Sequence, residues 1–523
     1  MPNATTVATV PTATAELIDA PRDDVVGERA DGPGRYVLQH GPFAGYERTV
    51  TSGAADADGN VTVVQRFEWR LPRGTWPLLI NPAMRRALRA PKPDGKLPWW
   101  FPPDRPDRQG ASVLGLLASL SVIVGYHGTL LGQSMTFAAD EFGSSATAQG
   151  AALSWARIGG FMAIALGAAA DRRGRRRLVL LSLLLCIGST VAGAFSPNLA
   201  VLATTQAVNR GAWAGAVLLL GVVVAEEMPK GARAYAAGLL SMATALGAGM
   251  ALWFLPLADL GPRAWRILYL IPLLFLPALA RYGRMLPESR RFVRPHTTES
   301  LQGHGGRLVL LASAGFLLNV FVGPQTQFRN EFLRDERGLS AAAVSLFALL
   351  TATPAGIGIV VGGRLADTRG RKVVAAVSAA VGLTLLAASF SLSGPWMWLA
   401  ATAGTIIAAP LDPIVRVYGP ELFPTSLRAR ATGIVATTAM LGSVLGLLCA
   451  GVLRDALGSW GRTMAILALA PLAMAALVTL RFPETARREL EDINPEDRPG
   501  APPAAFVEAD ADADPDDAEP QKA

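Results

Sequence analysis

A few ionisable side chains lie inside long apolar segments of this 523-residue chain. They are His127, Arg157 and Arg210 in the first half, and Asp412 with Arg416 in the second. Placing a charged group in an apolar environment is costly, so such residues usually bind a ligand or carry a proton or ion. We therefore take these five residues as candidate binding or proton-transfer groups.

Two of these candidates have alternative explanations. His127 lies in Gly125-Tyr126-His127-Gly128, and an imidazole with a pKa of about 6.5 exchanges its proton at physiological pH. It could hold a proton or a ligand, or it could make a polar contact between helices. Asp412 and Arg416 are four residues apart and share one face of a helix, so an ion pair within that helix is an alternative to a binding role.

Polar and aromatic residues add weaker candidates. Asn319 and Gln325 flank Gly323-Pro324, where a helix is interrupted and hydrogen-bonding groups become available. The side chains of Trp155, Trp213 and Trp253 could line a cavity for an organic molecule, although tryptophan in such segments also serves in packing.

The residues needed for an enzyme or a metal centre are missing from these segments. The chain has four histidines and two cysteines, Cys186 and Cys449, and neither cysteine has a ligand spacing. No catalytic triad or paired-carboxylate spacing occurs in the apolar segments, and no G-x-x-x-x-G-K-[ST] phosphate loop occurs in the chain. We expect no enzymatic activity, no cofactor and no metal.

Composition places these residues in a membrane. The chain is 51% hydrophobic and 17% charged, with a mean hydropathy of +0.33. Apolar segments of about 20 residues cross a hydrocarbon core of about 30 Å, and they must be helices because lipid satisfies no backbone hydrogen bond. The predicted spans are 111–133, 147–170, 178–196, 199–225, 234–258, 264–286, 307–325, 341–366, 373–392, 396–418, 430–453 and 460–481.

Two basic turns between these spans repeat each other. The turns 167–177 and 363–372, hereafter the basic turns, both follow the pattern G-x-x-x-D-x-x-G-R-[RK], with an offset of 196 residues. Their second glycines permit a tight turn between antiparallel helices. The repeated residues are Gly167, Asp171, Gly174, Arg175 and Arg176, and then Gly363, Asp367, Gly370, Arg371 and Lys372.

Two further charged motifs repeat in the same register. One is a glutamate followed seven residues later by an arginine, Glu226 with Arg233 and Glu421 with Arg428, offset by 195 residues. The other is a Pro-Glu pair followed by arginines, with an offset of 196. Its charged residues are Glu288 with Arg290 and Glu484 with Arg487. Three paired motifs in register indicate that the second half of the membrane region repeats the first.

These motifs resemble the loop signatures of the major facilitator superfamily, and in particular its sugar-porter branch with the related organic-ion and metabolite–proton symporters. The resemblance spans roughly residues 111 to 490. It implies an all-α membrane fold of twelve helices in two six-helix bundles. It also implies that the basic turns and the charged pairs form a charge lock that closes the cytoplasmic side. The alternative is that the arginines only anchor these loops at the lipid headgroups.

The chain departs from that pattern at two positions. Proton-coupled relatives often carry an acidic residue after the aromatic residue of the first helix, where this chain has His127. Arg210 lies only sixteen residues before Glu226, which is closer than the usual spacing of the corresponding arginine. Neither residue therefore takes its role from the resemblance alone.

The chain divides into five expected regions. Residues 1–110 form a cytoplasmic extension that we expect to be partly disordered, with a possible β-hairpin from 46–50 and 61–69 and a short interfacial helix around Met84. The two bundles are expected at 111–286 and 307–482, joined by a polar linker at 287–306 and followed by an acidic, disordered tail at 483–523. Basic residues gather in the loops on one side, which places both termini in the cytoplasm of a cell-membrane protein.

We predict a secondary transporter of a small organic solute such as a sugar, an organic acid or a related metabolite. It would work by alternating access, with protons as the coupling ion and as a monomer in the lipid bilayer. An exporter of drugs or metabolites on the same fold is the first alternative, and a membrane sensor or scaffold that moves no solute is the second. The net charge of +7 does not indicate nucleic-acid binding, because the basic residues lie in short turns between apolar spans.

Overall fold

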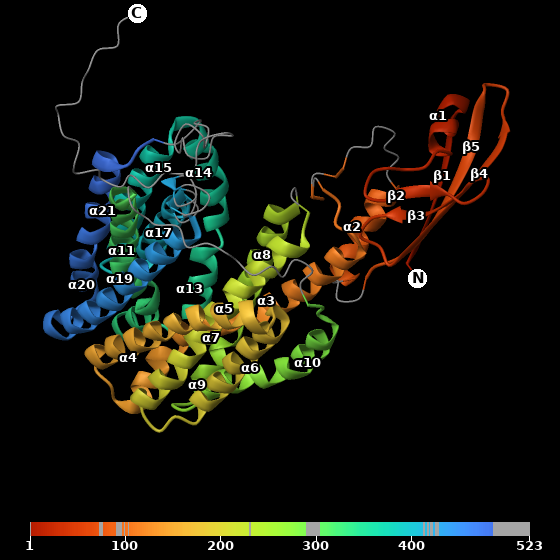
Figure 1. Ribbon diagram of the computed structural model, residues 1–523. Helices are drawn as coiled ribbons and strands as arrows, with labels where there is room; N and C mark the ends of the chain where they lie inside the picture. The colour runs from red at the N-terminus through yellow and green to blue at the C-terminus, as the bar shows by residue number, and fades with distance from the viewer. Residues whose placement is uncertain are drawn as a thin grey trace, which may run out of the picture.

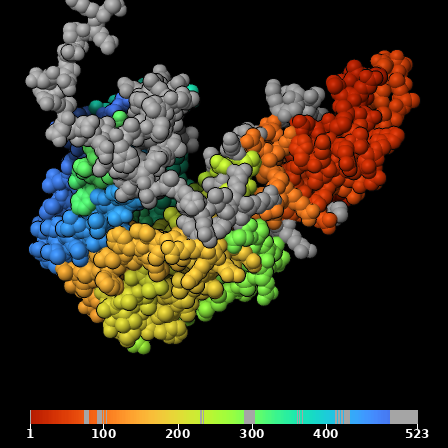
Figure 2. Space-filling model, in the orientation of Figure 1, coloured from red at the N-terminus to blue at the C-terminus, as the bar shows by residue number. Residues whose placement is uncertain are grey.

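The computed structural model describes residues 2–72, 77–89, 97–98, 100–102, 104–229, 232–288, 304–411, 414–415, 418, 422–423 and 428–484. A small β-sheet module comes first, and a large helical body follows it (Figure 1). In the space-filling view the sheet module projects from the helical body as a separate lobe (Figure 2).

The sheet module is an antiparallel sheet in the order β1-β5-β4-β3-β2. The expected hairpin is present as β4 and β5, with Tyr46 opposite Trp69 and Val50 opposite Gln65. The alternation in β5 buries one face of the strand and exposes the other. The strands are β1 (Asn3–Pro11), β2 (Gly27–Ala30), β3 (Arg35–His40), β4 (Gly45–Ala55) and β5 (Asn60–Arg70), with α1 (Thr12–Ile18) between the first two.

The described part of residues 1–110 contains more structure than the expected hairpin, because it forms a five-stranded sheet. Three or more strands with one apolar face form a stable unit once that face is covered, whereas a lone hairpin is marginal. Here Val25, Val26 and residues of α2 (Pro77–Arg89) cover the sheet. The sequence shows that α2 is amphipathic but not what its apolar face covers, because that contact joins segments far apart in the chain.

The expected interfacial helix is part of this core. In α2 the side chains of Met84 and Leu88 are 4% and 1% exposed, and both pack into the sheet module's core. Arg22 donates a hydrogen bond to the carbonyl oxygen of Leu88 (2.7 Å), which ties the helix to the segment before β2. Met84 and Leu88 of α2 thus pack inside the protein and are not available to lipid.

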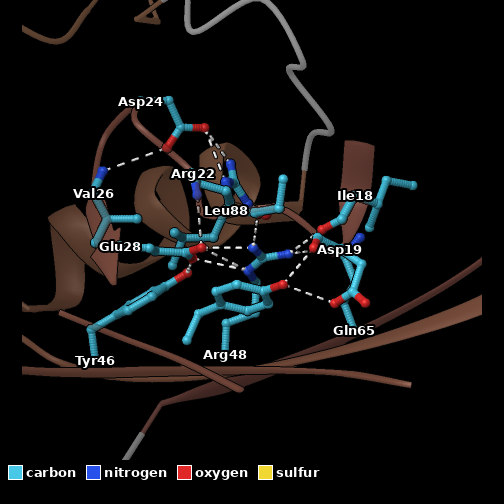
Figure 3. Close-up of polar contacts among 12 residues, drawn as sticks. Ile18, Asp19, Arg22, Asp24, Val26, Glu28, Tyr46, Arg48, Gln65 and Leu88 are labelled. Atoms are coloured by element: carbon cyan, nitrogen blue, oxygen red, sulfur yellow. Dashed lines mark hydrogen bonds and ion pairs between the residues drawn. The ribbon is translucent and has the colours of Figure 1, made fainter. Parts of the chain in front are cut away.

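A buried ion pair lies at the centre of the sheet module (Figure 3). Arg48 and Glu28 have fully buried side chains, and a guanidinium nitrogen lies 2.6 Å from a carboxylate oxygen. Arg48 also donates to the carbonyl oxygens of Ile18 and Ala20, both at 2.7 Å. Tyr46 donates to Glu28 (2.6 Å), and burial together with this carboxylate raises the pKa of Tyr46 well above its usual range.

The helical body contains eleven helices that are long and apolar enough to cross a membrane, counted over the described residues. They account for eleven of the twelve predicted spans. The predicted span 396–418 begins as α17 and runs into positions outside the described residues. The helices of the first half are α3 (Arg108–Phe142), α4 (Ala146–Ile158), α5 (Met162–Arg173), α6 (Arg175–Ala194), α7 (Leu199–Glu227), α8 (Arg233–Phe254), α9 (Trp265–Leu270) and α10 (Leu276–Met285).

Short 3-10 and π segments join several of these helices into longer spans. One span, for example, is continuous from Ala146 to Ala170 through the 3-10 turn Gly159–Phe161. The helices of the second half are α11 (Gly305–Gln327), α12 (Arg329–Glu331), α13 (Ala341–Ala352), α14 (Ala355–Arg369), α15 (Arg371–Val377), α16 (Leu383–Ala388), α17 (Gly394–Ala408), α19 (Arg428–Leu457), α20 (Trp460–Leu467) and α21 (Leu469–Arg481).

The repeat in the sequence is also a repeat in the packing. Helix α8 lies against α3, and α19 lies against α11. A Cβ at Gly247 would lie 1.9 Å from the carbonyl oxygen of Val122, and a Cβ at Gly442 would lie 2.3 Å from that of Phe316. Gly442 lies 195 residues after Gly247, and Phe316 lies 194 residues after Val122. Glycine therefore brings the same two helix backbones into contact in each half.

The buried ion pair yields a test of the sheet module. Replacing Arg48 with methionine leaves the Glu28 carboxylate buried without its cation, which costs roughly 3 to 5 kcal/mol. We expect the amides of β4 and β5 to exchange with solvent about 100-fold faster or more in the full-length protein, measured by hydrogen exchange and mass spectrometry. Arg66→Met, on the exposed face of β5, is the matched control. Equal exchange in the two variants would show that the buried Glu28 does not need Arg48 as its partner.

Candidate functional site

The two basic turns have the same backbone conformation. Gly174 joins α5 to α6 with φ +93°, and Gly370 joins α14 to α15 with φ +109°. Residues with a Cβ rarely adopt this conformation, which explains the glycine at both positions. The prediction of a tight turn between two helices is confirmed at each.

A glutamate from the end of each half binds the helix that follows each turn. Glu288 accepts hydrogen bonds from the backbone N–H groups of Arg175 (2.7 Å) and Arg176 (3.1 Å) at the start of α6. Glu484 accepts from those of Arg371 (2.9 Å) and Lys372 (3.2 Å) at the start of α15. A carboxylate is favourable there because the first N–H groups of a helix lack partners and the helix dipole is positive.

Side-chain contacts extend this arrangement in the first half. Arg175 forms an ion pair with Glu226 (2.7 Å), and both side chains are mostly buried. Arg176 donates to the carbonyl oxygen of Gly283 in α10 (3.0 Å), and Arg233 donates to that of Met228 (3.4 Å). The structure thus brings the first basic turn, Glu226 and Glu288 together.

Several predicted residues fall outside this description. A Cβ at Gly167 would lie 3.2 Å from Leu218, so that glycine is in close contact with α7. The side chains of Asp171, Asp367 and Arg428, and the surroundings of Gly363, lie outside the described part. Arg290, Asp412, Arg416, Glu421 and Arg487 lie outside the described residues altogether.

Two aspartates join the halves at the helix ends opposite the basic turns. Asp455 of α19 accepts a hydrogen bond from the backbone N–H of Thr147 in α4 (2.9 Å). Asp259 accepts from the N–H groups of Ala341 (3.1 Å) and Ala342 (3.3 Å) at the start of α13. The two aspartates are 196 residues apart, so each half binds a helix N-terminus of the other through the same repeated carboxylate. We name this arrangement the reciprocal aspartate clamp.

Further polar contacts join the halves near this clamp. Asn330 donates to the side-chain oxygen of Gln133 (2.8 Å), and Arg334 pairs with Asp140 (3.0 Å). Helix α4 also runs against α19 (Figure 1). Sequence reasoning missed Asp259 and Asp455. Their common offset of 196 residues, at the ends of two apolar spans, is the signal that could have found them.

Three of the predicted pathway residues line one cavity. His127, Arg157 and Arg210 come from α3, α4 and α7, and Gln327 of α11 reaches the same cavity from the second half. Its empty volume is about 340 Å³, including solvent at its mouth. The other lining residues are Gly128, Leu131, Gly132, Leu153, Ala156, Gln206 and Asn209.

The imidazole of His127 presents an unpaired nitrogen. Its Nδ1 lies 2.8 Å from the carbonyl oxygen of Ile123, and a carbonyl only accepts, so Nδ1 carries the proton. Nε2 is then a bare acceptor, it has no hydrogen-bond partner, and the residue is 2% exposed. Gln206 Nε2 and Asn209 Oδ1 also lack partners around this cavity. The site therefore offers both unpaired donors and unpaired acceptors to a ligand.

Arg210 is held by an aromatic ring. Its guanidinium lies 4.2 Å from the centre of the Trp213 ring, a cation–π distance. A Cβ at Gly128 would lie 2.4 Å from Trp213 Nε1, so glycine next to His127 makes room for this ring. Trp155 and Trp253, in contrast, are 52% and 56% exposed on the surface of the helical body.

A second cavity lies in the other half. It has an empty volume of about 300 Å³ and contains the predicted residue Gln325 together with Arg329 and Thr351. The predicted residue Asn319 donates to the carbonyl oxygen of Gly315 in its own helix (3.0 Å). Arg329 was not among the predicted site residues, because it lies between the predicted spans 307–325 and 341–366. Pro324 does not end the membrane span, which runs from Gly305 to Glu336.

The carboxylates at the basic turns provide a stability test. Glu288→Ala removes the group that accepts from the first N–H groups of α6, and the loss of such a cap costs about 0.5 to 2 kcal/mol. We expect a lower Tm for this variant and for Glu484→Ala in the purified protein. Arg284→Ala, an exposed site on α10, is the control. An unchanged Tm in both glutamate variants would show that these contacts do not hold the turns.

Comparison with known proteins agrees with this architecture. Residues 114–304 match the family described as "Sugar (and other) transporter", and residues 308–509 match the family described as "Major Facilitator Superfamily". The chain is 24% identical over 442 residues to the glucose transporter GlcP of Staphylococcus epidermidis, a match that covers 74% of this chain and 97% of that protein. The sheet module lies outside both family matches.

Solved structures show the same fold at low sequence identity. The inward-open xylose transporter XylE from E. coli superposes with a TM-score of 0.62 at 16% identity, covering 73% of this chain and 99% of that one. The nucleoside transporter NupG superposes with a TM-score of 0.57 at 14% identity, covering 70% and 100%. With the two family matches on the two repeated halves, the chain belongs to the major facilitator superfamily and is a multi-pass membrane protein, a secondary transporter of a small solute and not an enzyme.

Proposed function

We propose that the protein moves a small organic solute across the cell membrane by alternating access, driven by protons. The observation that carries this proposal is the cavity shared by His127, Arg157, Arg210 and Gln327, which draws on both halves. In transporters built from two parallel repeats, the solute binds between the repeats, which then rock around it.

Such a motion needs contacts that keep each half rigid and contacts between the halves that can break, and the carboxylates provide both kinds. Glu288 and Glu484 each bind a helix of their own half, so they keep the basic turns intact as a half moves. Asp259 and Asp455 each bind a helix of the other half, so the reciprocal aspartate clamp must break when that side opens. The glutamate contacts therefore persist throughout the transport cycle, whereas the aspartate contacts form and break.

The orientation follows from charge. The basic turns belong on the cytoplasmic side because positive residues are retained there. Both termini then lie in the cytoplasm, and the reciprocal aspartate clamp closes the extracellular side. The sheet module, which precedes α3, then lies on the cytoplasmic side as well.

Proton coupling rests on His127. Its Nε2 is an unpaired acceptor at the cavity, so it can accept a proton there when the site opens to the acidic side. The names of similar proteins agree with this proposal, because one solved relative is a D-xylose–proton symporter with a TM-score of 0.60 at 18% identity.

Transport in proteoliposomes tests the coupling. A pH gradient, acidic outside, should accelerate the uptake of one solute class from a panel of hexoses, pentoses, nucleosides, organic carboxylates and organic cations. His127→Ala should abolish the acceleration, because the variant lacks the proton acceptor. His40→Ala, in the sheet module and more than half exposed, is the control and should behave as the wild type. Uptake that ignores the gradient in the wild type would overturn proton coupling.

Reversible cross-linking tests alternating access. In a variant without Cys186 and Cys449, the substitutions Thr147→Cys and Asp455→Cys place two thiols across the clamp. We expect oxidation to block transport and reduction to restore it, and the second pair, Asp259→Cys with Ala342→Cys, should do the same. A cross-link within one half, Glu141→Cys with Arg263→Cys, is the control. Unimpaired transport by both clamped variants would contradict the mechanism.

A further inference from the structure

The cavity around His127 contains two positive charges and no negative one among its described lining residues. Arg157 and Arg210 lie close enough for their like charges to repel each other. The structure describes no ion pair for either residue. Two guanidinium groups in a membrane-embedded cavity thus lack a counter-charge from the described protein, and a bound anion would supply it.

Four other arginines of the helical body are paired with carboxylates of the protein. Arg175 pairs with Glu226, Arg334 with Asp140, and Arg454 with Glu336. Arg266 pairs with Glu141 (3.0 Å) and also donates to the carbonyl oxygen of Ala194 (2.6 Å). The two cavity arginines differ from these four, because the described protein supplies them with no carboxylate.

The internal repeat indicates that the helices do not need these charges in order to form. The residues 196 positions after His127, Arg157 and Arg210 are Gly323, Thr353 and Ile406. No charged residue lies within five positions of Thr353 or of Ile406 in the sequence. The second half builds the corresponding helices without cations at these positions, so we infer that the first half carries them for another purpose.

The rest of the cavity limits the shape of the anion. Arg210 lies over the ring of Trp213, and a planar guanidinium binds a carboxylate through two parallel hydrogen bonds. Leu131, Leu153 and Ala156 form an apolar wall beside the charged groups. The donor on Gln206 Nε2 has no partner in the described protein and is available to an oxygen of the ligand.

We propose that the solute is a small organic carboxylate whose negative group binds Arg157 and Arg210 and whose apolar body contacts Leu131, Leu153 and Ala156. This inference rests on the transport function proposed above and names its substrate class. A neutral sugar would leave both arginines without a counter-charge, so it fits this cavity less well. Inorganic phosphate shares the anionic group but lacks the apolar body.

Binding to the purified full-length protein tests the proposal without any transport step. Calorimetry with acetate, benzoate and succinate, with glucose and xylose, and with inorganic phosphate should show saturable binding of an organic carboxylate and weaker binding of the others. Arg157→Gln and Arg210→Gln should each weaken carboxylate binding by about 30-fold or more, because each removes one partner of a desolvated charge pair. Arg210→Lys keeps the charge but not the paired donors, so its loss should be smaller.

A stability measurement separates a binding role from a structural one. Arg263→Gln removes an arginine of the same half whose side chain is 83% exposed, and it should leave affinity unchanged. Without ligand, the Tm of Arg210→Gln should equal or exceed that of the wild type, because one of two repelling charges is gone. A much lower Tm, with carboxylate binding retained in the folded fraction, would make the arginines structural and overturn the proposal.

Transport assays then distinguish failure of this inference from failure of the proposed function. Saturable binding and uptake of glucose or xylose, with no carboxylate binding, would overturn the carboxylate site and leave the transporter intact. Tight binding of inorganic phosphate alone would also overturn it, because the apolar wall would then be unused. Carboxylate binding without uptake of any solute would support the site and count against the transport function.

Discussion

The first N–H groups of a helix have no partner within that helix, and lipid provides none. This protein satisfies four helix starts with carboxylates that are distant in sequence. Glu288 and Glu484 bind the helices that follow the basic turns, whereas Asp259 and Asp455 bind helices across the two halves. The first pair stabilises each half, and the second pair holds the halves together on the opposite side. Much of the transporter's architecture depends on where these four groups lie.

The same structural contacts occur in both repeated halves. The charged residues of the proposed binding site do not follow this repeat. The glycine contacts between α3 and α8 recur between α11 and α19, and the carboxylates recur 196 residues apart. His127, Arg157 and Arg210 have no charged counterpart at that offset. In our proposal, the contacts that recur build the scaffold, whereas His127, Arg157 and Arg210, which do not recur at that offset, serve the solute.

The sheet module and the helical body differ in how their buried charges are paired. Its core contains a fully buried ion pair, Arg48 with Glu28, which is satisfied by Tyr46 and by backbone carbonyl groups. Such a pair contributes little net stability when complete, but removing one partner is costly. The cavity arginines of the helical body are the opposite case, because their partner is missing from the described protein and is supplied, in our proposal, by the solute.

Local patterns in the chain were enough to predict the membrane class, the repeat, the basic turns and three residues of the cavity. Apolar length sets the spans, glycine marks the turns, and charge inside an apolar segment marks a site. Only the tertiary structure shows that His127, Arg157 and Arg210 share one cavity. It also shows that Asp259 and Asp455 bind helices of the opposite half. It was also needed to show that α2 covers a sheet. Each of these depends on contacts between segments far apart in the chain, whose distances no local pattern encodes.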